Sequence, residues 1–316
     1  MSAAVNYPIS NVMRPMYHLW DAVWVVPTFQ DGSLGFRDFT IESEFPWTRA
    51  THGNFEFNWK GGAQLTRLNR VFWWSSILAS VMYLIFLFGG QRIMKDKKAM
   101  EFKGPLAIWN LVLAVFSFIG TFRLVPHLLY GLYINPHSYF FCRTADAAYG
   151  HIGAVALWTN LFVWSRFVEL IDTAFLVVRK KPVSFLHWFH HATVLMYCWH
   201  AGQYHMPTGI FFATMNYVVH SIMYFYYFLA AVGKPPKWGK IVTILQIAQM
   251  LIGMFVTGYH YYLLQTVPNC DGSYENLFAA FVMYTAYMIL FVQFFMSRYS
   301  ESQHLSDSTR SKKKLQ

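Results

Sequence analysis

The sequence predicts an all-α polytopic membrane protein with seven transmembrane helices. Hydrophobic residues make up 55% of the 316 residues and charged residues only 13%, well below the charge of a soluble domain. Long apolar runs fill most of residues 72–297, and Lys and Arg cluster in the short segments between them. This is the pattern of membrane topology, so the net charge of +10 indicates membrane loops and we expect no nucleic-acid partner.

Each apolar run is long enough to cross a hydrocarbon core of about 30 Å, which takes roughly 20 helical residues. Residues 1–60 lack a basic stretch followed by an apolar core, so no cleavable signal peptide is predicted. These residues are rich in Pro, Gly and aromatic side chains, and they could form either a flexible tail or a membrane-surface segment. The predicted spans are 72–90, 105–131, 150–178, 184–202, 207–231, 238–264 and 276–297.

The basic loops predict the orientation of the chain. The positive-inside rule places "QRIMKDKKAMEFKG" (91–104), "RKKP" (179–182) and "GKPPKWGK" (233–240) in the cytosol, together with the C-terminus. The N-terminus and the intervening loops then face the lumen. We therefore divide the chain into a luminal N-terminal segment (1–64), a seven-helix domain (65–300) and a cytosolic basic tail (301–316).

Two further features agree with this orientation. Residues Lys313 to Gln316 form a dilysine ending of the kind that returns proteins to the endoplasmic reticulum, so we expect a multi-pass protein of that membrane. Cys142 and Cys270 fall in different predicted luminal loops, and an oxidising lumen favours a disulfide between them over two unpaired thiols. Cys198 lies within an apolar span and is expected to be a small core residue.

Polar side chains of four predicted spans fall at a similar depth, in the cytosolic half of the bundle. Ionisable groups are expensive in a bilayer, so a shared depth predicts one internal pocket that opens to the cytosol. Deeper apolar walls suit an amphipathic substrate with a charged head and a long tail. The residues are Arg166, Glu169 and Asp172 in the third span, His187, His190 and His191 in the fourth, Asn216, His220, Tyr224 and Tyr227 in the fifth, and Gln246 and Gln249 in the sixth.

Each group has a structural alternative. Carboxylates and glutamines also form hydrogen bonds between membrane helices. Three histidines at i, i+3 and i+4 share one helix face, however, which favours chemistry. Arg179 and Lys180 border the predicted mouth, where they could attract a phosphorylated head group. His200, His205 and His260 lie near luminal ends of spans and are expected to be ordinary interface residues.

Two kinds of chemistry suit the histidines. One is metal binding, as in membrane di-iron desaturases and hydroxylases, but such sites need several His-rich boxes and this sequence has one. The other is nucleophilic catalysis, in which a neutral imidazole accepts an acyl group while a neighbouring histidine and an amide stabilise an enolate oxygen. A non-enzymatic seven-helix receptor or carrier is a further alternative.

Four motifs together resemble those of the ELOVL/ELO family, the very-long-chain fatty acid elongases, which are 3-ketoacyl-CoA synthases of the endoplasmic reticulum. The similarity covers residues 65–300 in the family's order and spacing. The form of the histidine motif is most like the branch that acts on saturated and monounsaturated acyl chains. The motifs are "RFVELIDT" (166–173), "HWFHH" (187–191), "NYVVHSIMYFYY" (216–227) and "TILQIAQ" (243–249).

The resemblance implies a fold in which six of seven helices enclose an acyl tunnel. It implies condensation of long-chain acyl-CoA with malonyl-CoA to 3-ketoacyl-CoA, CO2 and CoA, by a ping-pong route through an acyl-histidine. No metal or other cofactor is expected. The implied partners are the two CoA substrates, membrane lipid, and the reductases and dehydratase of the elongation cycle, and the chain could assemble as a homo-oligomer.

The resemblance also assigns roles by position. His190 is the implied nucleophile, His187 and His191 orient it or handle protons, and Asn216 and His220 serve the malonyl half-reaction. Glu169 and Asp172 are expected to fix the histidines, and Arg166 stands where the family usually has Lys. Gln246, Gln249, Tyr224, Tyr227, Arg179 and Lys180 are expected to line or support the substrate site, and Cys142 and Cys270 match the family's luminal cysteine pair.

Overall fold

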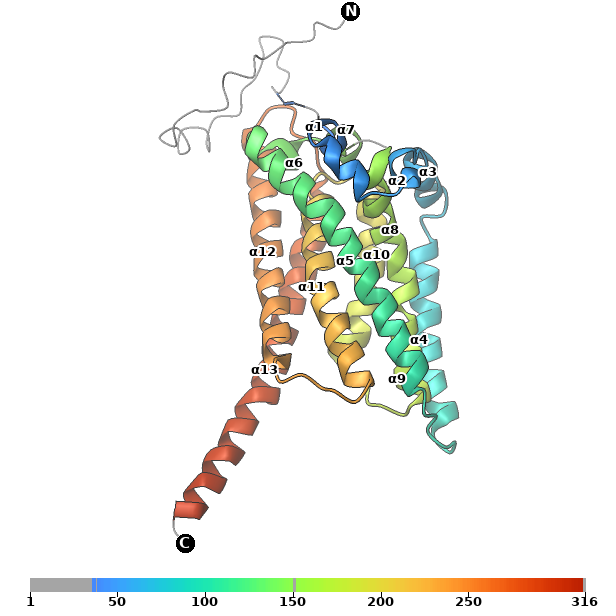
Figure 1. Cartoon of the computed structure of the whole chain (residues 1–316), viewed down its shortest axis with the longest axis vertical. Helices are drawn as coiled ribbons and strands as arrows, with labels where there is room; N and C mark the ends of the chain where they lie inside the picture. The colour runs from blue at the N-terminus through green and yellow to red at the C-terminus, as the bar shows by residue number, and fades with distance from the viewer. Residues whose placement is uncertain (1–35, 38, 150–151, 315–316) are drawn as a thin grey trace, which may run out of the picture.

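The computed structural model describes residues 36–37, 39–149 and 152–314, and this part of the chain contains helices and turns but no strand. Figure 1 shows the long helices running side by side, with the short N-terminal helices gathered at one end. The short helices are α1 (Ile41–Glu44), η3 (Pro46–Ala50), α2 (Asn54–Phe57), α3 (Gly62–Val71), α6 (Tyr139–Cys142) and α7 (Ala145–Tyr149). The long ones are α4 (Ser75–Met94), α5 (Lys103–Ile134), α8 (Gly153–Glu169) with α9 (Ile171–Val178), α10 (Phe185–Gln203), α11 (Gly209–Ala231), α12 (Gly239–Thr266) and α13 (Tyr274–Lys314).

Four of these helices are long and apolar enough to cross a membrane: α4, α5, α12 and residues Tyr274–Tyr299 of α13. The predicted helical membrane fold is therefore confirmed, and four of the seven predicted spans meet this criterion. The helices that fall outside it include α10 and α11, which carry the histidines and amides that lower the mean hydropathy of their sequences.

The third predicted span, residues 150–178, is two helices rather than one. Leu170 lies between α8 and α9, where the backbone forms i→i+3 hydrogen bonds from Leu170 N to Phe167 O and from Thr173 N to Leu170 O. Such bonds tighten the chain relative to a regular α-helix. The break places Glu169 and Asp172 on separate helices.

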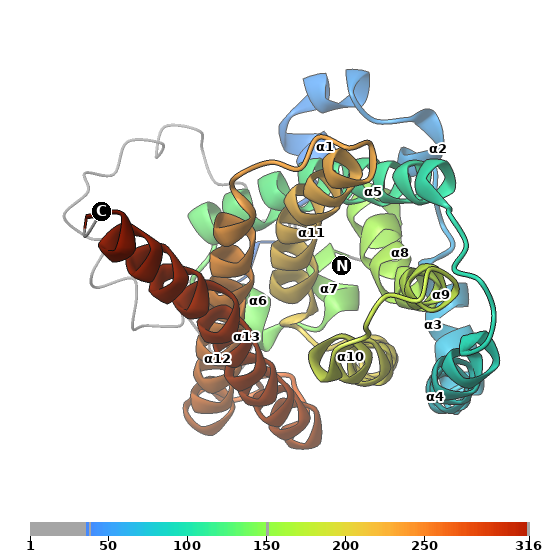
Figure 2. The same ribbon diagram turned by 90° about the horizontal axis from the view of Figure 1, so that it is seen from below.

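Six of the long helices follow one another in a closed ring (Figure 2). The order of packing is α5, α8, α10, α13, α12 and α11, and α11 packs back against α5. Helix α4 lies outside this ring, against α9 and α10. The contact between α5 and α11 is close because Gly120 has no side chain: an added Cβ would lie 2.7 Å from the ring of Tyr217.

The described part of the N-terminal segment packs against the bundle. Phe39 stacks on His127 of α5 with ring centroids 4.5 Å apart. Glu56 is only 2% exposed, and its carboxylate accepts hydrogen bonds from Arg123 Nε at 3.0 Å and Trp158 Nε1 at 2.9 Å. The alternative of a flexible tail is therefore wrong for residues 39–60. The buried Glu56 carboxylate explains why this segment packs against the bundle, because the charge of Glu56 is balanced there by Arg123 of α5.

The predicted disulfide is present. Cys142 at the end of α6 is bonded to Cys270 in the loop between α12 and α13. Cys198 is buried and reduced, as expected for a core residue. The dilysine prediction involves Lys313 and Lys314, at the end of α13, and residues 315–316, which lie outside the described residues.

Candidate active site

A cavity of about 270 Å³, here called the histidine chamber, lies among α8–α9, α10, α11, α12 and α13. Its lining combines polar side chains from all four predicted polar groups with apolar ones. The chamber is therefore a single place where distant segments of the sequence meet. The predicted residues that line it are Glu169, Asp172, His187, His190, His191, Asn216, His220, Tyr224, Tyr227, Gln246 and Gln249.

The start of α10 sets the positions of the three histidines. Ser184 is the N-cap, and its side-chain oxygen accepts a hydrogen bond from the backbone N–H of His187 at 3.2 Å. The next turn of the helix then brings His190 and His191 beside it. The ring centroids are 4.5 Å apart for His187 and His191 and 5.4 Å apart for His190 and His191.

A pair of hydroxyl groups holds His187. Its Nε2 lies 2.8 Å from Thr173 Oγ1 of α9, and Thr173 Oγ1 lies 2.9 Å from the Tyr83 hydroxyl of α4. Thr173 is the last residue of the motif 166–173, whereas the sequence gives no signal for Tyr83, which lies within an apolar run. The outer helix α4 thus contributes to the orientation of a histidine.

His190 lies against Tyr287 of α13, with ring centroids 5.0 Å apart. The Tyr287 hydroxyl is 2.6 Å from Thr193 Oγ1 and 3.3 Å from the His190 backbone oxygen, so it braces the helix. Within the described part of the chain, no side chain hydrogen-bonds to the His190 ring, which lines the chamber. Sequence reasoning missed Tyr287 because nothing in the run 276–297 distinguishes it from packing residues.

Asn216 and His220 form a pair on α11. Asn216 Nδ2 lies 3.1 Å from His220 Nε2, so the amide donates and the hydrogen of the imidazole is on Nδ1. His220 Nδ1 lies 3.8 Å from Glu169 Oε1, which is too far for a hydrogen bond but close enough for electrostatic attraction.

Glu169 is also joined to Arg166 in a buried ion pair on α8. The two residues are 3% and 2% exposed. Arg166 donates further to Ser165 Oγ at 3.0 Å and to the Phe162 backbone oxygen at 3.3 Å. Arg166 does not line the chamber. It therefore supports Glu169 from behind.

Asp172 does not fix a histidine, contrary to expectation. Its carboxylate accepts hydrogen bonds from Trp109 Nε1 of α5 at 2.6 Å and from the Tyr224 hydroxyl of α11 at 2.8 Å. The carboxylate bonds these groups because the face of α9 that bears Asp172 turns toward α5 and α11. Thr173, one residue later, points to His187 instead.

Four residues discussed from the sequence lie at the ends of the bundle, outside the chamber lining. Arg179 and Lys180 lie outside the chamber lining, and Lys180 Nζ donates to the backbone oxygens of Lys95 and Lys97 at 2.8 Å and 3.1 Å. Its ammonium thus holds the loop after α4. His260 is fully buried and bonds the Asp271 backbone oxygen at 2.9 Å, and His205 is 9% exposed, so neither is an ordinary interface residue.

The described residues contain no group of three or more His, Cys, Asp and Glu side chains that could hold a metal ion. The di-iron alternative therefore gains no support from the arrangement of the chamber.

Comparison with known proteins gives one family. Residues 70–307 match the model of the GNS1/SUR4 (ELO) family. A Trypanosoma cruzi protein named very long chain fatty acid elongase 4 is 38% identical over 242 residues, covering 74% of this chain and 83% of its own.

Two proteins named very long chain fatty acid elongase 6 are also similar. The Drosophila melanogaster protein is 40% identical over 223 residues, covering 69% of this chain and 70% of its own. The Homo sapiens protein is 37% identical over 229 residues, covering 72% and 85%. The order of motifs, the chamber that they build and the match over residues 70–307 agree: the chain belongs to the GNS1/SUR4 (ELO) family.

Proposed function

We propose that this protein is a fatty acid elongase that condenses a long-chain acyl-CoA with malonyl-CoA, giving 3-ketoacyl-CoA, CO2 and CoA. One observation carries the proposal: His190 and the Asn216–His220 pair line the same chamber, with a potential nucleophile and potential enolate-stabilising groups together. The names of the similar proteins support the same activity.

In the first half-reaction, a ring nitrogen of His190 attacks the thioester carbonyl of the acyl-CoA. A C–N bond forms, the C–S bond breaks, and the proton lost by the imidazole goes to the CoA thiolate. In the described part of the chain, no side chain forms a hydrogen bond with the His190 ring nitrogens, so the ring is available for this step. His191 is the adjacent imidazole in the chamber and is the proposed carrier of that proton.

In the second half-reaction, malonyl-CoA loses CO2 and the electron pair of the broken C–C bond attacks the acyl carbonyl. The new C–C bond forms as the acyl–nitrogen bond breaks, and His190 recovers its proton from water. Negative charge develops on the thioester oxygen of the malonyl unit. The N–H groups of Asn216 and His220 are the proposed donors to that oxygen.

The acyl chain is proposed to lie inside the six-helix ring, along the apolar side chains of the chamber. We also propose that all seven long helical segments span the endoplasmic reticulum membrane, with the N-terminus luminal and the C-terminus cytosolic. The apolar residues that line the chamber are Leu186, Val219, Met223, Met250, Phe291 and Phe294.

The test uses purified full-length protein, a series of long-chain acyl-CoAs and malonyl-CoA labelled at its free carboxyl group. Release of labelled CO2 together with 3-ketoacyl-CoA supports the function. Incubation with acyl-CoA alone should add the mass of one acyl group to the intact protein. Absence of product with every chain length contradicts the function, whereas turnover without the added mass contradicts only the acyl-histidine route.

A further inference from the structure

A large groove lies between α5 and α8, with the start of α4 and Trp199 of α10 beside it. Its volume is about 520 Å³, which is within the range of pockets that bind small molecules. We call it the outer groove. It shares no lining residue with the histidine chamber, so a molecule bound in it would be distinct from the substrates of the chamber.

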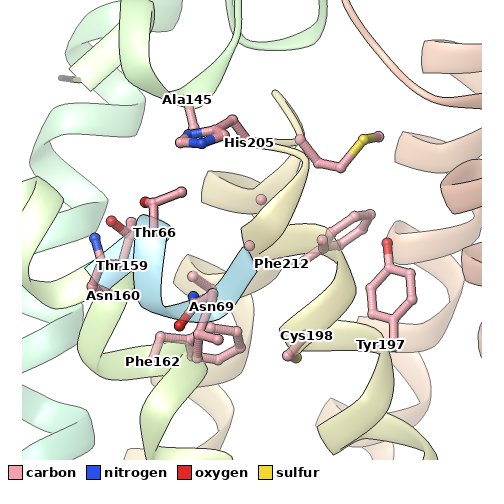
Figure 3. Close-up of a pocket in the computed structure, with 16 residues that line it drawn as sticks. Thr66, Asn69, Ala145, Thr159, Asn160, Phe162, Tyr197, Cys198, His205 and Phe212 are labelled. Carbon is pink, nitrogen blue, oxygen red and sulfur yellow. The ribbon is translucent and has the colours of Figure 1, made fainter. Parts of the chain in front are cut away.

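Helix α8 separates the outer groove from a smaller cavity of about 80 Å³. Figure 3 shows the smaller cavity, with the buried Asn69 of α3 and Thr159 of α8 on its wall. Leu161 and Val168 line the outer groove instead, and helix periodicity turns them to the opposite face of α8 from Thr159 and Val163. Val168 is 47% exposed. The outer groove therefore opens on the outside of the bundle, where lipid surrounds a membrane protein.

Two polar groups in the wall of the outer groove have no partner. Ser75 Oγ and Trp164 Nε1 are buried atoms, and neither forms a hydrogen bond with any described residue. The other two indoles of the groove, those of Trp109 and Trp199, each donate a hydrogen bond, at 2.6 Å and 3.2 Å. Because an unpaired buried polar group is costly, the two unpaired groups indicate a ligand that can form hydrogen bonds with both.

The two unpaired groups lie at the same end of the groove. The Phe72 backbone oxygen accepts hydrogen bonds from the Ser75 backbone N–H at 2.9 Å and from Trp199 Nε1 at 3.2 Å. The Trp199 ring packs edge-on against the Trp164 ring, with centroids 5.1 Å apart. Ser75 and Trp164 therefore flank one indole, where a single small polar group of a ligand can reach them.

This polar end lies at the border of the membrane. Ser75 is the first residue of α4, one of the helices that are long and apolar enough to cross a bilayer. Trp73 and Trp74 come directly before it and are 57% and 46% exposed, as is typical of aromatic residues at a membrane–water interface. The groove also follows α5 from Phe116 to Trp109, a length of about 10 Å. An amphiphile in the groove would thus have its polar end at the interface and its apolar body in the hydrocarbon.

The lining selects the chemistry of the polar end. Among the described residues, no Lys, Arg, Asp or Glu side chain lines the outer groove, so it offers no partner for a phosphate. One hydroxyl suits the two unpaired groups, because its oxygen accepts from the Trp164 N–H and its hydrogen is donated to Ser75 Oγ.

The lining also selects the shape of the apolar body. Half of the lining residues are aromatic, with Phe116 on α5 and Phe167 on α8 among them. A flexible chain loses conformational freedom when it is held against such rigid walls, whereas a fused-ring body has little freedom to lose. A flat, rigid lipid with one hydroxyl is the occupant that meets both conditions.

We propose that the outer groove binds a sterol, with its hydroxyl between Ser75 and Trp164 and its ring system packed on α5 and α8. The sterol joins α4 to the helix ring, and α4 carries Tyr83, whose hydroxyl bonds Thr173 beside the chamber. The inference concerns a membrane lipid and does not rest on the proposed function.

The experiment uses full-length protein in phospholipid nanodiscs that contain a trace of a sterol with a photoreactive diazirine on its ring system. After illumination, the labelled peptides are mapped by mass spectrometry, and we expect the label on residues 109–116 and 161–168. Unlabelled sterol should compete with the probe at roughly 10-fold lower concentration than the same ring skeleton without a hydroxyl, the value of about two hydrogen bonds.

Two kinds of variant test the contacts. The double change Ser75→Ala, Trp164→Phe removes both polar groups, so the two competitors should become equal. The matched control is Trp47→Phe, Ser297→Ala, which makes the same exchanges at exposed positions and should keep the difference.

The second variant, Val112→Trp, fills the groove with an indole and should abolish the labelling of α5 and α8. Val282→Trp is its control, because Val282 is similarly exposed but lies on α13, away from the groove. Each variant is first tested for a normal thermal transition. The two kinds of variant act independently, so the loss of one to misfolding leaves the other as a test.

Three results would overturn the inference. Label spread evenly over α12 and α13 as well as the groove would show that the sterol is only part of the surrounding bilayer. Equal competition by the two ring skeletons in the unaltered protein would show that the polar groups do not bind the hydroxyl. A linear alcohol that competes as well as the sterol would assign the groove to a flexible chain. None of these results affects the proposed function, which is tested by condensation.

Discussion

Thr173 and His187 lie on different helices, and Thr173 Oγ1 is 2.8 Å from His187 Nε2. Tyr83, on the helix outside the ring, lies 2.9 Å from the same threonine oxygen. The direction of an imidazole in the chamber thus depends on contacts from α4, α9 and α10. An error in the packing of α4 would be transmitted to the site through two hydrogen bonds.

Thr173→Val should lower kcat/KM for condensation by about 10-fold, which corresponds to the loss of one buried hydrogen bond. The exchange keeps the shape of the side chain but removes the oxygen shared by Tyr83 and His187. Steady-state kinetics with one long acyl-CoA measure the effect. Thr121→Val is the control, since among the described residues the Thr121 hydroxyl bonds only the Ser117 backbone oxygen of its own helix. Equal kinetics for the two variants would show that the contact to His187 is dispensable.

His190→Ala should reduce condensation by at least about 1,000-fold, because the proposed nucleophile is removed. Intact-mass measurement after incubation with acyl-CoA should find no acyl group on this variant, while its thermal transition stays close to that of the unaltered protein. His137→Ala serves as control, because His137 is exposed and lies in the turn before α6. A His190→Ala protein that still carries an acyl group would assign the nucleophile to another residue.

Arg166→Leu should lower the free energy of unfolding by about 3–5 kcal/mol, because the Glu169 carboxylate is left buried without its cation. The double change Arg166→Leu, Glu169→Gln should recover part of this loss, since no charge remains unpaired. Denaturation in detergent micelles measures both. Lys103→Leu is the comparison: its pair with Glu101 is exposed with a 4.0 Å separation, and such pairs contribute about 0–1 kcal/mol. Similar losses at the two sites would contradict the argument from burial.

Glu56→Gln should loosen the N-terminal segment and lower stability by about 2 kcal/mol, since Glu56 loses the charge that faces Arg123. Limited proteolysis should then cleave the chain between residues 39 and 61 faster than in the unaltered protein. Glu101→Gln is the control, because that carboxylate is exposed. An unchanged cleavage rate at Glu56→Gln would mean that the aromatic contacts of Phe39 hold the segment alone.

The sequence by itself determined the helical membrane class and most of the polar residues of the chamber. Apolar runs separated by basic loops leave helices as the only local way to satisfy the backbone in lipid. Regular spacing then reveals shared faces, as for His187, His190 and His191. The disulfide could also be predicted, because two cysteines in one compartment leave few pairings.

Only the tertiary structure decided which side chains form hydrogen bonds with each other. Asp172 bonds Trp109 and Tyr224, and Thr173 bonds His187, although the two residues are neighbours in sequence. The packing of Tyr83, Tyr287 and Asn69 is likewise absent from any local pattern. Helix periodicity fixes the face on which a residue lies, but the rotation and depth of one helix against the next depend on side chains distant in sequence, and these set the contacts that orient the site.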